Sequence, residues 1–309
     1  MKINSYNTKE FLEFSKYSNK NVINRYLFKY DEYKNSEFPI HLINKENLVL
    51  RRNIYAIATP ILFCGPTRTD FLNNVFNSLD EDISSGFIQS RVKKSDLETN
   101  IDNKCYYYIV EVRNNYRVDL EIDNDNYFNT LKRDSKQRYK KIYTMNHKYN
   151  LIENSNCTKS IELFAELYKH NSLINKFPKT YIFNKEVWIK LLSADLWKLY
   201  SLFYENKLVS ACVLAQVDDT YDYSFMAFNN DHKDASRALI FFLRNHLNSI
   251  GTKKYLYLGG GIRETDSLAD FKKSVGGVAV PFSRIKFINK KIFNIECEEA
   301  EKLLKGRWP

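Results

Sequence analysis

The chain has 309 residues, of which 44% are hydrophobic and 15% aromatic, and its formal net charge is +10. This length suits two domains of about 150 residues, and the apolar fraction is enough to build a core. No secretory signal opens the chain, no run of about 18 apolar residues can span a membrane, and the five scattered cysteines lack metal-ligand spacing. We therefore expect a cytoplasmic protein with reduced thiols, no membrane span and no metal.

The excess of Lys and Arg has two readings. It favours polyanionic partners such as nucleic acid, an anionic membrane or coenzyme phosphates, or it reflects solvated surface lysines. The charge is spread along the chain, without a basic tail, a zinc finger or an RNA-binding signature.

The first half predicts strands, one helix and a hairpin. The helix is capped by Thr69 and carries its apolar residues at helical spacing. The strands are expected at 47–52, 53–63 and 85–92, and the hairpin at 106–112 and 117–122.

Helices are expected in the middle of the chain. The first, 127–143, is very basic, a second carries an apolar stripe from Ile161 to Tyr168, and a third is capped by Asn184. The cations of the first helix are Lys132, Arg133, Lys136, Arg138, Lys140 and Lys141.

The second half repeats the order of hairpin, helix and strand. Strands are expected at 208–217 and 221–228, followed by a helix that Asp234 caps and Gly251 ends, and by a strand at 255–258. The repeated order suggests two similar α+β halves, which we place at 1–155 and 156–309.

The loop and helix after residue 228 form a candidate phosphate site. The first backbone N–H groups of a helix have no internal partner, and the helix dipole adds positive potential there. Ala235 and Ser236 are small enough for close approach of a ligand, and Lys233 and Arg237 add charge. An ordinary capped helix is the alternative interpretation.

A second candidate site is the glycine run after the strand at 255–258. Gly259, Gly260 and Gly261 permit special backbone torsions or close approach of a ligand. Asp266 then opens a short helix as its cap, and Lys272 on that helix can place a cation near a developing oxyanion or a phosphate.

The run Tyr257-Leu258-Gly259-Gly260-Gly261, followed by Asp266-Ser267-Leu268 and Phe271-Lys272, resembles the signature of the FemAB-like branch of the GNAT (acetyltransferase) superfamily. Upstream segments agree in order, among them Thr59-Pro60, Gly65-Pro66, Val118-Asp119-Leu120 and Tyr181-Ile182-Phe183. The resemblance covers about residues 47 to 285.

The resemblance implies two tandem GNAT-like mixed-sheet domains, the first of them degenerate, and transfer of an acyl group to an amine. Members include peptidoglycan aminoacyltransferases that use charged tRNA, and acyl-CoA-dependent enzymes that act on nucleotide-linked amino sugars. In the aminoacyl branch the lysine that matches Lys272 is thought to stabilise the reacting carbonyl. The large helical arm of some tRNA-dependent members is missing here, which weakens the tRNA interpretation.

Further residues can serve this chemistry. Asp222 and Tyr223 alternate on one strand, so at most one faces a cleft, and Tyr223 can protonate a thiolate. His170 is a candidate base, and Arg68 and Arg91 can bind acceptor phosphates. Each also has a purely structural or surface interpretation.

We expect an acyl-CoA-dependent N-acyltransferase whose acceptor is a nucleotide-linked amino sugar, such as a dTDP-3-amino-3,6-dideoxyhexose, in surface polysaccharide synthesis. The first half would bind the sugar nucleotide and the second half the acyl donor. Aminoacyl transfer from tRNA to a peptidoglycan precursor is the second hypothesis, since it would use the basic helix. The third is a non-enzymatic nucleic-acid binder with steeply salt-dependent binding.

Overall fold

The computed structural model describes residues 22–29, 37–47, 52–57, 61–63, 83–90, 106–177, 182–217, 219–260 and 267–305. For the first five of these ranges the description covers the backbone. The chain divides into two compact units, of which one comprises mainly Tyr6–Arg113 with Pro281–Pro309 and the other mainly Asn114–Val280. These divisions lie elsewhere than the expected boundary between residues 155 and 156.

The first unit contains a mixed sheet whose strands follow the order β1-β2-β3-β5-β12-β6, with β4 beside β5. β12 is antiparallel to β5, whereas β3 is parallel to β5. Two short helices, α10 (Lys290–Phe293) and α11 (Cys297–Lys305), follow β12. Ala300 and Leu304 of α11 pack on Ile288, so α11 covers part of this sheet. The strands are β1 (Val22–Lys29), β2 (Glu37–Asn47), β3 (Arg52–Ile57), β4 (Ile61–Phe63), β5 (Ile83–Ser90), β6 (Tyr106–Asp119) and β12 (Val278–Asn289).

The second unit continues from β6 in the order β6-β11-β10-β9-β8-β7. The neighbours β7, β8, β9 and β10 are antiparallel, and β10 and β11 are parallel. Mixed pairing with helices on both faces confirms the predicted α+β class. The strands are β7 (Tyr149–Glu153), β8 (Trp197–Tyr204), β9 (Lys207–Val217), β10 (Thr220–Phe228) and β11 (Tyr255–Gly260).

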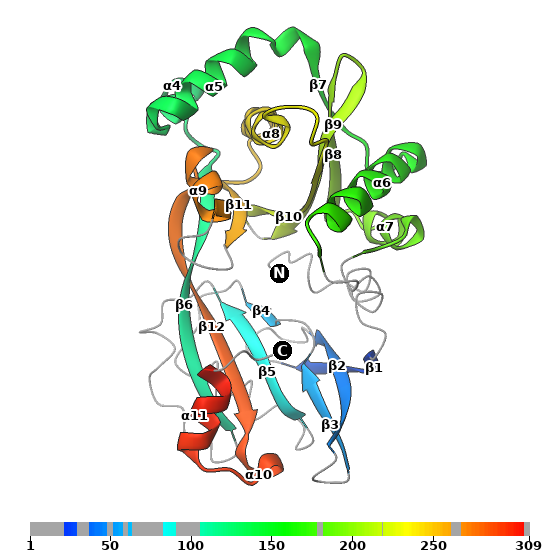
Figure 1. The fold of residues 1–309 in the computed structure, drawn as a ribbon, viewed down its shortest axis with the longest axis vertical. Coiled ribbons are helices and arrows are strands. Elements are labelled where there is room, and N and C mark those ends of the chain that lie inside the picture. The colour runs from blue at the N-terminus through cyan, green and yellow to red at the C-terminus, as the bar shows by residue number, and fades with distance from the viewer. Residues whose placement is uncertain are drawn as a thin grey trace. The chain divides into compact units, whose positions relative to one another are not determined.

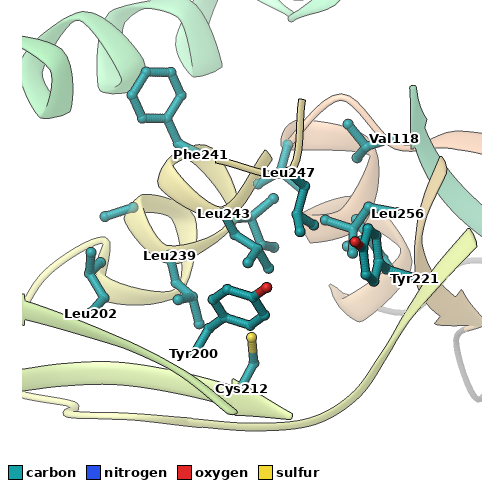
Figure 2. Packing of buried hydrophobic residues seen from close by; sticks show 14 of the residues in the cluster. Val118, Tyr200, Leu202, Cys212, Tyr221, Leu239, Phe241, Leu243, Leu247 and Leu256 are labelled. Carbon is teal, nitrogen blue, oxygen red and sulfur yellow. The ribbon is translucent and has the colours of Figure 1, made fainter. Parts of the chain in front are cut away.

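Helix α8 (Ala235–Ile250) covers one face of the sheet strands of the second unit (Figure 1). Leu239, Leu243 and Leu247 point from it toward the strands, where Tyr200 and Cys212 lie against them (Figure 2). Gly251 ends the helix in the left-handed region with φ 66°, and its N–H donates to the Leu247 carbonyl. The predicted helix and its C-terminal glycine are therefore confirmed.

Helices α6 (Thr158–Ile174) and α7 (Lys185–Leu192) pack on β8 and β10 through aromatic side chains. Trp188 of α7 and Tyr168 of α6 contact the ring of Phe225 on β10. The side chain of Asn184 accepts a hydrogen bond from Val187 N–H, as a helix cap does. The predicted stripe of α6 is buried, as is the expected core of α7.

The prediction of a single basic helix at 127–143 is wrong. The structure has two helices, α4 (Asn124–Thr130) and α5 (Arg133–Thr144), separated by two residues with extended backbone, Leu131 and Lys132. Leu131 lies at this break, and its side chain is buried in the hydrophobic core. Asp123, rather than a later residue, caps the first of the two helices.

The hairpin expected within 106–122 is also wrong, because β6 is one strand of 14 residues. The residues between the two expected strands lie inside it, and Asn115 among them pairs with Gly260 of β11. Pairing with β11 keeps β6 extended through its polar residues, where local sequence preference alone favours a turn.

Strand β5 confirms the strand expected at 85–92 apart from its ends. The helix capped by Thr69 lies outside the described residues, so the repeated order of elements stays a prediction. No helix in the described ranges is both long and apolar enough to cross a bilayer.

Candidate functional site

Strands β10 and β11 pair only at their beginnings. Their register has three pairs, which end at Asp222 and Tyr257. Beyond this point β10 continues along β9 through an irregularity between Tyr223 and Phe225, and β11 continues along β6 as far as Gly260. Two strand edges that part in this way can accept an extended ligand through main-chain hydrogen bonds.

Helix α8 begins directly after the loop that follows β10. Ala235 N–H donates to the His232 carbonyl at 3.2 Å, and Ala238 N–H donates to the Asp234 carbonyl at 2.8 Å. The N–H groups of Ser236 and Arg237 lie between them, in the turn where a helix supplies no acceptor. Ala235 and Ser236 therefore lie where they were expected, at the positive end of the helix dipole, and Lys233 is exposed in the preceding loop.

Asp234 precedes α8 but does not cap it as expected. Its backbone is left-handed, with φ 65°, whereas a capping residue is extended, and its side chain makes no capping hydrogen bond. The carboxylate instead pairs with two arginines, at 2.7 Å from Arg138 Nη1 and 3.7 Å from Arg237 Nε. An ion pair to α5 thus replaces the cap.

Arg237 joins α8 to helix α9 (Ser267–Ser274). Its Nη1 donates to the hydroxyl of Ser274 at 2.9 Å and to the Ser274 carbonyl at 3.3 Å. The guanidinium also lies over the ring of Phe271, 5.7 Å from its centroid. Arg237, expected to attract phosphate, is therefore already bonded to the C-terminal end of α9.

Lys272 of α9 is buried and reaches the glycine run at the end of β11. Its Nζ donates to the Gly260 carbonyl at 2.7 Å. Gly259 has φ 74°, and a Cβ atom there would lie 3.6 Å from Lys272 Nζ. The structure thus brings together Gly259, Gly260 and Lys272, and the positive φ, rather than lack of space, favours glycine at 259. Gly261 and Asp266 lie outside the described residues.

Asp222 and Tyr223 differ in their surroundings on β10. Tyr223 packs on the core beneath α8, whereas the Asp222 carboxylate lies 3.4 Å from the Thr220 hydroxyl, which donates to the Val217 carbonyl at 2.8 Å. Burial, and next the nearby Cys212, raise the pKa of Tyr223 well above its usual value. Its hydroxyl therefore stays protonated at neutral pH.

His170 is exposed on α6, but the residue after it has a clear role. Asn171 donates from Nδ2 to the Phe228 carbonyl at 2.7 Å and accepts from Phe228 N–H at 2.6 Å. These two bonds fix the end of β10, just before the loop that leads to α8. Arg68 and Arg91 lie outside the described residues. Within those residues, no three His, Cys, Asp or Glu side chains gather as a metal site.

Tyr223→Phe is expected to leave stability unchanged or raise it by about 1 kcal/mol, because it removes a buried hydroxyl for which the described residues supply no hydrogen-bond partner. If the hydroxyl protonates the leaving group, kcat should fall about a hundredfold. Urea unfolding and initial rates measure the two effects. Tyr221→Phe is the matched control, since its hydroxyl bonds Thr252 at 2.9 Å and its loss should destabilise. An unchanged rate would exclude Tyr223 as the acid.

No family model and no curated protein matches the chain. Among solved structures, FemX has a TM-score of 0.64 at 12% identity, over 97% of this chain and 94% of that chain. L-PGS from Bacillus licheniformis has a TM-score of 0.55 at 11% identity, over 97% and 98% of the two chains. The C-terminal domain of a putative lysylphosphatidylglycerol synthetase from Agrobacterium fabrum has a TM-score of 0.52 at 12% identity, over 97% and 98%. The chain therefore has the fold of these proteins, as the glycine run and Lys272 predicted.

Proposed function

We propose that this chain is an N-acyltransferase that moves an acyl group from acyl-CoA to the amine of a nucleotide-linked amino sugar. The observation that carries the proposal is the contact of Lys272 with Gly260, at the end of the strand that parts from β10. The donor's pantetheine arm would lie between the parting strands, and its pyrophosphate would lie on the N–H groups of Ser236 and Arg237.

In this proposal the reaction is aminolysis of a thioester, and the candidate residues have distinct roles in it. The acceptor nitrogen attacks the carbonyl carbon, and negative charge grows on the carbonyl oxygen. The buried ammonium of Lys272 stabilises that charge in a site of low dielectric. The carbon–sulfur bond breaks, the sulfur takes the proton of the Tyr223 hydroxyl, and the nitrogen loses its proton to a base. Asp222 and His170 are the candidates for that base.

The experiment is titration of the full chain with acetyl-CoA, with desulfo-CoA and with a dTDP- or UDP-linked amino sugar, followed by release of free thiol when donor and acceptor are mixed. Micromolar binding of acetyl-CoA and thiol release that requires the amino sugar would support the proposal. If acetyl-CoA does not bind and no thiol is released, CoA is not the donor.

A second candidate is aminoacyl transfer from charged tRNA, and helix α5 favours it. One face of α5 packs inward through Tyr139 and Ile142, so the helix is anchored and its outer face is left polar. That face is too polar to insert into a bilayer. Its cations extend along more of the helix than the phosphates of a single coenzyme could contact, as a longer polyanion could. The exposed cations of α5 and the residue before it are Lys132, Arg133, Arg138, Lys140 and Lys141.

The two donors are separated by the variant Lys140→Gln/Lys141→Gln. If the donor is tRNA, RNA binding should weaken, and the slope of log affinity against log salt should fall by about 2. Acetyl-CoA binding should not change. RNA binding that does not respond to these substitutions would exclude α5 as the RNA surface.

A further inference from the structure

Asn171 is a buried polar residue of α6 whose side chain bonds a strand. Its exposed fraction is 3%, and its carboxamide exchanges two hydrogen bonds with the backbone of Phe228, the last residue of β10. Two residues of paired antiparallel strands exchange their N–H and C=O groups in the same way. The carboxamide therefore takes the place of a neighbouring strand at this one position.

The residues on either side of Phe228 are held by β9. The Ser210 hydroxyl donates to the Ala227 carbonyl at 3.0 Å, and Asn229 N–H donates to the Val209 carbonyl at 2.8 Å. Successive residues of a strand present their polar backbone groups to opposite edges, so Phe228 faces away from β9. Asn171 thus supplies, from the other edge, the contact that β9 cannot make.

The end of β10 determines where the loop 229–234 starts. Asp231 N–H donates to the Asn229 side chain at 2.9 Å, and His232 N–H donates to the Asn229 carbonyl at 3.2 Å, so the loop folds back on its own first residue. The first turn of α8 follows at once. A displacement of Phe228 would therefore be passed on to the N–H groups of Ser236 and Arg237.

The beginning of β10 is fixed by other contacts. Thr220, Tyr221 and Asp222 pair with β11 on one side and with β9 on the other. These pairs do not involve Asn171, and they precede the irregularity that follows Tyr223. Loss of the Asn171 bonds should therefore disturb the loop and the start of α8, but leave Asp222 and Tyr223 in place.

We propose that Asn171 is a positioning residue, which holds the loop 229–234 so that the start of α8 meets the phosphates of the acyl donor. The inference rests on the proposed function, in which the diphosphate of acyl-CoA lies on the N–H groups of Ser236 and Arg237. It concerns the phosphate end of the donor alone. Donors with and without phosphates should therefore respond differently to the loss of Asn171.

The test compares acetyl-CoA with S-acetyl-N-acetylcysteamine, a thioester without phosphates, in the full chain with the preferred amino-sugar acceptor. We expect Asn171→Ala to raise KM for acetyl-CoA about tenfold, with kcat within about twofold of wild type, because it weakens binding of the bound donor and of the transition state alike. The value of kcat/KM for the short thioester should stay within about twofold. A general loss of folded protein would instead lower the rates with both donors in the same proportion.

Isothermal titration with inorganic pyrophosphate makes the same comparison without catalysis. Asn171→Ala should weaken its binding about tenfold. Asn175→Ala is the matched control, because Asn175 lies one turn later on α6 and is exposed, and its side chain donates to the Asn171 carbonyl at 2.8 Å. This control should leave both KM and the pyrophosphate affinity within about twofold of wild type.

Asn171→Asp is the second variant, for the case that Asn171→Ala does not fold. A carboxylate keeps the shape of the side chain and still accepts from Phe228 N–H, but it has no N–H for the Phe228 carbonyl. It should therefore raise KM for acetyl-CoA in the same direction while the short thioester is used as before. Circular dichroism checks that each variant is folded.

Equal losses with the two donors, or a KM for acetyl-CoA that both variants leave within twofold of wild type, would overturn the role of Asn171 and leave the proposed function standing. Pyrophosphate binding that the Asn171 variants weaken, in a chain that transfers no acyl group, would refute the proposed function and keep the role of Asn171 at this loop. A wild type that neither binds pyrophosphate nor transfers an acyl group would refute both.

Discussion

Lys272→Met is expected to lower kcat for acyl transfer about a hundredfold, with a small change in KM for the donor. The methionine keeps most of the buried stem but removes the ammonium that donates to Gly260 at 2.7 Å. If the ammonium stabilises the developing oxyanion, its loss affects the transition state much more than the bound donor. Steady-state kinetics with the preferred donor and acceptor measure both constants.

Lys273→Met is the matched control for this substitution. Lys273 follows Lys272 on α9, but its side chain is 41% exposed and lies 3.8 Å from Asp270, one turn earlier. Such a pair contributes little, so the control should remain within about twofold of wild type in rate. Equal rates for the two variants would remove Lys272 from the mechanism.

Gly276→Ala is expected to destabilise the protein by about 3 kcal/mol or more. Gly276 has φ 81°, and a Cβ atom there would lie 2.5 Å from Cε2 of Tyr127. Tyr127 cannot easily move, because its hydroxyl donates to the Val275 carbonyl at 2.8 Å and is 2.9 Å from the Tyr139 hydroxyl. For a domain of this size the melting temperature should fall by about 10 °C.

Gly251→Ala isolates the backbone contribution. Gly251 has φ 66°, but the nearest atom to a Cβ there is the Asn248 carbonyl oxygen at 3.9 Å. Only the torsional cost of about 1 kcal/mol remains, or about 3 °C in melting temperature. Calorimetry of both variants compares them directly. Equal losses of stability would show that Tyr127 yields to the added methyl group.

Local patterns predicted the helices that local interactions specify. The stripe of α6, the asparagine cap of α7 and the glycine end of α8 each depend on residues within a few positions of one another. The break between α4 and α5 was missed because it depends on Leu131 entering the core, and the continuous β6 because it depends on pairing with β11. Both are decided by segments far away in the sequence.

The candidate site shows the same limit. The glycine run and Lys272 were selected from the sequence, and the structure brings Gly259 and Gly260 to Lys272. The attachment of Arg237 to Ser274 and the ion pair of Asp234 with Arg138 were not foreseen. These contacts join residues tens of positions apart, and no spacing rule identifies such partners.

The position of β12 has a consequence for how the chain is made. Among the described strands β12 is synthesised last, yet it lies between β5 and β6 in the sheet order. Until residues 281–289 have been synthesised, β5 and β6 each lack β12 as the neighbour on one side. The unpaired backbone groups on that side can promote aggregation. The second unit, whose residues 114–280 are made earlier, can complete its own sheet first. Premature termination before β12 would therefore leave the first unit, rather than the second, without the strand that joins β5 to β6.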